Sequence, residues 1–190
     1  MLTEPSTPTD STSTPPPSPR PDAVAVALGV VAALVMIVVY PTVGVTLAVP
    51  LVGAGIIATG DQRSGRLPNT HTAALFAATM LAVAIGSYAT DTGTWTTALA
   101  GAVMWSVPLF VMAVAGSFGG GDFKFAASLG AMCGWIGLPT AAGGLIAALV
   151  ACCIAGAAVA WRARTTNTPL RLGLPLYVGT IATIIVAAVQ

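Results

Sequence analysis

The chain has 190 residues, of which 56% are hydrophobic and 7% are charged, and its formal net charge is +1. Soluble domains carry about 25% charged residues. Charge this sparse cannot cover a globular surface in water, so most of the surface must face lipid. The near-neutral balance gives no electrostatic basis for binding nucleic acid. The three cysteines form no C-x-x-C pair, which excludes a zinc ribbon, and we expect no metal or other cofactor.

Residues 1–22 consist mainly of Pro, Ser and Thr and contain almost no apolar side chains. Such a segment cannot bury enough surface to offset its conformational entropy, so we predict a disordered cytoplasmic tail. It differs from a secretory signal because its polar stretch is long and no clear cleavage site follows the first apolar run. Residues 23–190 are predicted to form one transmembrane domain.

Proline, glycine and charged residues divide this apolar region into candidate membrane helices, which need about 20 apolar residues each. The predicted spans are residues 23–40, 43–59, 71–89, 95–115, 125–138, 141–161 and 174–189. The first two are slightly short, so a single bent helix over both is the alternative. The predicted fold is therefore an all-α transmembrane bundle of six or seven spans. Abundant Gly and Ala favour close approach of the helices.

The distribution of positive charge supports this division, because cytoplasmic loops of membrane proteins are enriched in Lys and Arg. With the N-terminus inside, the tail and the loops after the second, fourth and sixth spans face the cytoplasm. These segments hold all the basic residues: Arg20, Arg63, Arg66, Lys124, Arg162, Arg164 and Arg171. The predicted outer turns hold none, and one of them carries Asp91.

Two carboxylates stand at the predicted cytoplasmic boundary. Asp61 follows the second span and Asp122 follows the fourth, so both emerge on the same side of the membrane. When two carboxylates lie close together, repulsion between their negative charges makes it unfavourable to ionise both, and the pair titrates as a unit. One then acts as general base and the other as general acid on a shared water molecule. This arrangement predicts peptide hydrolysis without a metal or a covalent intermediate.

The residues around the two aspartates are expected to bind substrate or shape the loops. They are Gly119, Gly121, Lys124, Pro68 and Asn69. The glycines lack a Cβ atom, which would let a substrate backbone lie beside Asp122. The Pro-Asn pair is a turn signal that would begin the next span and fix the Asp61 loop. Lys124 is interpreted as a snorkelling topology anchor, with a role in loop shape as the alternative.

Two motifs contain these residues. The first is an Asp followed by a basic stretch and (I/L)-P-N, and the second is G-x-G-D-x-K. The matching residues are Asp61, Arg63, Arg66, Leu67, Pro68 and Asn69, then Gly119, Gly121, Asp122 and Lys124. Together they resemble the signatures of type IV prepilin peptidases and preflagellin peptidases, and the resemblance covers roughly residues 43–185. The larger bacterial members carry paired C-x-x-C motifs in a cytoplasmic insertion and also methylate their product. This chain has neither the insertion nor the paired C-x-x-C motifs, and it resembles the short form of the family.

The resemblance implies a membrane-embedded endopeptidase of the inner, cytoplasmic membrane, with its active site facing the cytoplasm. Its substrates would be pilin-like precursors of a type IV pilus or secretion system, held in the lipid bilayer. The enzyme would remove their short basic leader, and the two aspartates would carry the reaction.

Two alternatives remain at this point. One is an intramembrane protease of the presenilin or signal-peptide-peptidase type, which has its first aspartate in a mid-span Y-D pair and a P-A-L motif. Here Thr59 and Gly60 precede Asp61, and P-A-L is absent. The other is a non-enzymatic transporter or scaffold protein, because paired acids also relay protons. Transport acids usually lie at mid-membrane depth, which would distinguish the two cases.

Overall fold

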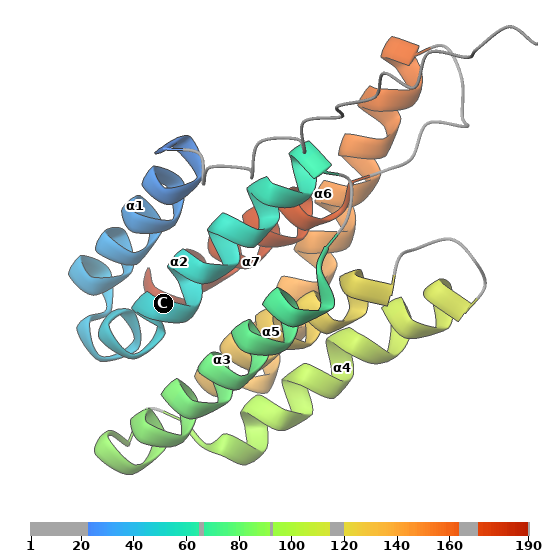
Figure 1. Cartoon of the computed structure of the whole chain (residues 1–190). Helices are drawn as coiled ribbons and strands as arrows, with labels where there is room; N and C mark the ends of the chain where they lie inside the picture. Colours follow the sequence, from blue (N-terminus) through green and yellow to red (C-terminus); the bar gives the residue numbers. More distant parts are fainter. Residues whose placement is uncertain (1–22, 65–66, 92, 115–119, 164–170, 190) are drawn as a thin grey trace, which may run out of the picture.

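The computed structural model describes residues 23–64, 67–91, 93–114, 120–163 and 171–189, which form seven α-helices and no strand (Figure 1). The helices are α1 (Ala23–Val39), α2 (Pro41–Ser64), α3 (Asn69–Ala89), α4 (Trp95–Val114), α5 (Gly120–Ile136), α6 (Leu138–Ala163) and α7 (Gly173–Val189). The prediction of an all-α bundle is confirmed. The predicted tail, residues 1–22, lies outside the described residues.

Several helices have the length and composition of membrane spans. Four meet both criteria, over Pro41–Asp61, Asn69–Ala89, Trp95–Val114 and Leu138–Arg162, and α1 and α7 contain shorter apolar stretches. Large apolar side chains are exposed on the outside of the bundle, as at Val38, which is 81% exposed. In a membrane these side chains face hydrocarbon rather than water. The molecule is a helical membrane bundle.

The first two helices are separate elements and not one bent helix. Pro41 is the first residue of α2, a position where its missing N–H is no loss. The turn is tight: a Cβ atom on Gly44 would collide with the backbone of Met36 and Ile37. Glycine is therefore required where α2 folds back along α1, and the described part of the chain forms seven helices.

The α5 helix is the centre of the bundle and packs against α2, α3, α4, α6 and α7. Its residues from Ser128 to Trp135 are all buried. The α4–α5 contact is a backbone contact, since a Cβ atom on Gly134 would lie 2.5 Å from the Thr97 carbonyl oxygen and 2.9 Å from the Cα atom of Gly101. Small residues spaced in this way let membrane helices pack closely.

The helices alternate in direction, so their ends gather at two ends of the bundle. In Figure 1 the α2, α4 and α6 helices end toward the upper and right-hand side, where α3, α5 and α7 begin. Lys124, Arg162 and Arg171 lie in segments at this end, while Asp91 lies between α3 and α4 at the other. The end where α2 stops and α5 starts carries the predicted site.

Candidate active site

Asp61 lies inside α2, because the helix continues to Ser64. The sequence placed Asp61 in a loop after residue 59, and that boundary was wrong. Ala54, Ala58 and Asp61 are all buried, with Asp61 only 5% exposed. Their spacing puts them on one face of α2, the face turned to the bundle. Packing of this face carries the helix through the polar residues that follow Gly60.

The Asp61 carboxylate is held by the first residue of α7. The Gly173 backbone N–H donates a hydrogen bond to Asp61 Oδ2 over 3.1 Å, and the bond is buried. Helix N-termini present unpaired N–H groups that suit an acidic acceptor. A Cβ atom on Gly173 would lie 3.0 Å from Asp61 Oδ2, so glycine is what permits the approach. Sequence reasoning missed Gly173, which is separated from Asp61 by more than one hundred residues.

Asp122 lies in the first turn of α5, which begins at Gly120 and not at residue 125 as the sequence suggested. An acidic residue in the first turn interacts favourably with the helix dipole, which helps to start the helix despite its glycines. The side chain is half-buried. Its carboxylate is near enough to the Cys152 thiol of α6 to interact with it electrostatically. Asp122 therefore lies within electrostatic range of α6.

Two direct contacts join the segments that carry the aspartates. Lys124 Nζ donates a hydrogen bond to Asn69 Oδ1 over 3.1 Å. One turn away, a Cβ atom on Gly121 would lie 2.6 Å from the Leu67 Cβ atom and 2.7 Å from the Leu67 carbonyl oxygen. The start of α5 is thus packed against the segment that leads from α2 into α3. The structure brings the two sequence motifs together.

The remaining candidates have distinct positions. Pro68 is the N-cap of α3, with φ −63° and ψ 128°, and its carbonyl oxygen accepts hydrogen bonds from the backbone N–H groups of His71 and Thr72. The prediction that the Pro-Asn pair begins this helix is confirmed. Gly121 meets Leu67 of its own chain, as described above, at the place where a substrate backbone was expected. Gly119 lies outside the described residues.

These features define a class of protein: a helical bundle of the membrane with two aspartates in helices at the same end. The particular family follows from comparison with known proteins. The model of the type IV leader peptidase family matches residues 48–161, more than half of the chain, and the chain belongs to this family. The protein is therefore a peptidase. No curated protein and no solved structure matches it.

The matched residues include Asp61, Asp122 and the Lys124–Asn69 contact. They do not include α7, whose first residue is the hydrogen-bond donor to Asp61. The family match therefore covers both motifs but not every residue that positions them.

Proposed function

We propose that this protein is an aspartic endopeptidase that removes the short basic leader from type IV pilin-like precursors, with Asp61 and Asp122 as its acid–base pair. The observation that carries the proposal is the contact between the two motif segments, through Lys124 with Asn69 and Gly121 with Leu67. Both aspartates belong to helices, Asp61 near the end of α2 and Asp122 at the start of α5, and these two helix ends lie at the same end of the bundle. Groups held on packed helices keep a more fixed geometry than groups on loops.

The pair acts through one water molecule. One carboxylate takes a proton from the water, whose oxygen attacks the carbonyl carbon of the scissile peptide bond. The protonated carboxyl group gives its proton to the carbonyl oxygen, and a tetrahedral diol forms. The diol then collapses, the C–N bond breaks, and a proton from the pair goes to the departing nitrogen. Proton transfer of this kind contributes about 10²- to 10⁴-fold to the rate.

The depth of the site favours this reading over the two alternatives. Asp61 is the last residue of the apolar stretch Pro41–Asp61, and Asp122 lies in the first turn of α5. Neither position is the middle of a span, where a transport acid or a mid-span intramembrane protease would have its carboxylate. A membrane-edge site suits a substrate that is cut where its apolar helix leaves the membrane.

By the positive-inside rule this end would face the cytoplasm, and we propose the inner membrane as the location of the protein. Arg63 near the end of α2 and three further basic residues, Lys124, Arg162 and Arg171, lie in segments at this end. A pilin-like precursor would present its leader here, with its apolar helix in the bilayer.

The test is co-expression with a pilin-like precursor, read as a shift of the precursor on a gel. Asp61→Asn and Asp122→Asn should each abolish cleavage while the protein still inserts into the membrane. Asp91→Asn is the matched control, because Asp91 is exposed at the other end of the bundle. Cleavage at the wild-type rate by either of the first two variants would refute the dyad.

A further inference from the structure

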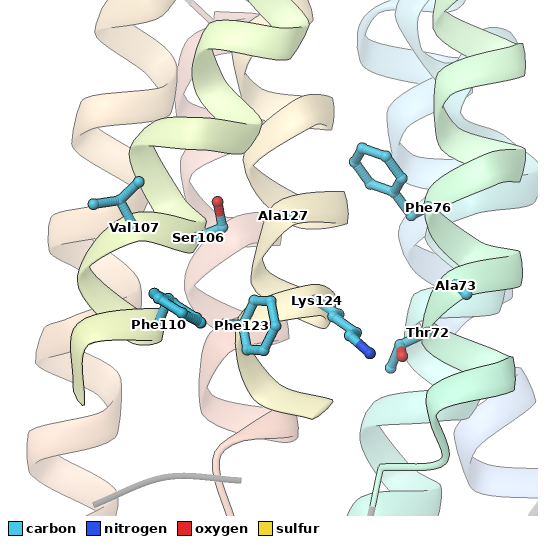
Figure 2. Close-up of a pocket in the computed structure, with 9 residues that line it drawn as sticks. All are labelled: Thr72, Ala73, Phe76, Ser106, Val107, Phe110, Phe123, Lys124 and Ala127. Atoms are coloured by element: carbon cyan, nitrogen blue, oxygen red, sulfur yellow. The ribbon is translucent and has the colours of Figure 1, made fainter. Parts of the chain in front are cut away.

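A groove of about 370 Å³ lies between α3, α4 and α5 (Figure 2). Phe76 of α3 and Phe110 of α4 form its walls, and Phe123 and Ala127 of α5 line its base. Figure 2 shows the Lys124 side chain extending from α5 across the groove toward α3. The volume falls within the range of roughly 300–1,000 Å³ that is usual for ligand sites.

This groove is separate from the proposed catalytic pair. Successive residues of an α-helix are about 100° apart, so Phe123, Ala127 and Lys124 lie about 100°, 140° and 200° around α5 from Asp122. The groove therefore occupies the face of α5 that is turned away from Asp122. Among the residues that line the groove there is no carboxylate.

The lining fits a hydrocarbon chain. The groove opens between α3 and α4, and both helices are long and apolar enough to span a membrane. Val107 and Phe110 are 52% and 49% exposed, so this side of the groove faces the bilayer. An apolar groove that opens into a bilayer is in contact with lipid chains rather than with water.

The positive charge of Lys124 at the end of the groove favours a lipid with an acidic headgroup. Lys124 Nζ bonds the neutral amide of Asn69 at 3.1 Å and lies 5.8 Å from the centre of the Phe123 ring. Neither group carries a negative charge. Lysine binds phosphate as a point charge, and basic residues at grooves between membrane helices bind acidic lipid headgroups.

We propose that this groove is a binding site for an acidic phospholipid. One acyl chain lies along the aromatic walls, and the headgroup phosphate pairs with Lys124. A zwitterionic lipid carries its own cation beside the phosphate and gains less from the lysine. One lysine near the surface gives about a fivefold preference for the acidic lipid. Because Lys124 also bonds Asn69, the bound lipid braces the contact between the two aspartate-bearing segments. The site does not depend on the proposed function.

The experiment is native mass spectrometry of the full chain released from nanodiscs of phosphatidylglycerol and phosphatidylcholine in equal amounts. We expect one retained phosphatidylglycerol, with about fivefold preference over phosphatidylcholine. Lys124→Gln should remove the preference, and Lys124→Arg should keep it. Filling the groove with Ala73→Leu and Ala127→Leu together should abolish retention, whereas Ala100→Leu on the exposed face of α4 should not. Thermal unfolding of each variant checks that it is folded.

Three results would overturn the site: no retained lipid, equal retention of both lipids by the wild type, or unchanged selectivity in Lys124→Gln. The Lys124→Gln measurement does not require the groove-filling variant to fold. A photo-reactive benzoylphenylalanine in place of Phe110 should crosslink to phosphatidylglycerol, and crosslinking to a co-expressed precursor instead would also overturn the site. None of these readouts uses cleavage, so a negative result here is distinct from failure of the proposed function.

Discussion

Gly173→Ala tests whether the start of α7 positions Asp61. The added Cβ atom would lie 3.0 Å from Asp61 Oδ2, 3.1 Å from the Asp61 Cβ atom and 3.3 Å from the Cα atom of Ala58. Ordinary carbon contacts are about 3.5–4.0 Å. The carboxylate must therefore move by several tenths of an ångström, away from the N–H group to which it is bonded at 3.1 Å.

Two effects of opposite sign determine the outcome. A hydrogen bond to a carboxylate is worth about 1.5–3 kcal/mol, and its loss in the transition state would lower the cleavage rate about ten- to hundredfold. Alanine is also better than glycine in a helix by roughly 0.5–1 kcal/mol, which offsets part of the lost bond in the folded state. We therefore expect a large fall in activity together with a net loss of stability of about 0.5–2.5 kcal/mol.

The assay is the initial rate of precursor cleavage by purified protein, together with the unfolding temperature in detergent. Gly60→Ala is the matched control, since Gly60 adjoins Asp61 in the chain and a Cβ atom there meets nothing within 4 Å. It should retain the wild-type rate. A Gly173→Ala variant with both wild-type cleavage and wild-type stability would show that α7 does not position the carboxylate.

Three further substitutions test the packing around the site. Gly121→Ala should cost about 1–3 kcal/mol of stability by overpacking against the Leu67 backbone, whereas Gly120→Ala, which meets nothing within 4 Å, should be neutral in thermal unfolding. Lys124→Met and Asn69→Ala should each slow cleavage. A double-mutant cycle on the cleavage rate should give a coupling free energy between the two residues of about 0.5–1.5 kcal/mol. Additive effects of the two substitutions would contradict a functional role for their hydrogen bond. Gly134→Val should prevent close packing of α5 on α4 and lower the unfolding temperature in detergent, and an unchanged temperature would contradict that packing.

The number of helices, to within the choice between six and seven, and the side on which each one ends could be predicted from the sequence. Apolar runs of sufficient length identify spans, and the number of spans between two residues fixes whether they share a side. Both facts depend only on the composition of each segment. The same-side placement of Asp61 and Asp122 was therefore accessible before any packing was known.

The helix boundaries at the site could not be predicted in the same way. Polar residues and glycine normally end a span, yet α2 continues past Gly60 to Ser64 and α5 begins at Gly120. Tertiary packing overrides local preference at both places. Asp61 completes the buried face of α2, and Gly121 fits against Leu67 only because it lacks a side chain.

The partners of the site residues are non-local, and no periodicity in the sequence encodes them. The Pro68-Asn69 pair was interpreted as a local turn signal, but the Asn69 side-chain oxygen accepts a hydrogen bond from Lys124, 55 residues away. The Gly173 contact with Asp61 depends on how α7 is set against α2. These relations require the register between helices, which hydropathy does not specify.

The position of Asp61 therefore depends on helices that carry no motif. The α7 helix is fixed against α2 by a hydrogen bond of 3.0 Å from the Tyr177 hydroxyl group to the Leu51 carbonyl oxygen. It is fixed against α6 by glycine, since a Cβ atom on Gly179 would lie 2.5 Å from the Cα atom of Ala148. These contacts fix the position of α7 along α2, and therefore the point at which the Gly173 N–H group meets the Asp61 carboxylate. Substitutions deep in α7 can thus alter the site without touching either aspartate.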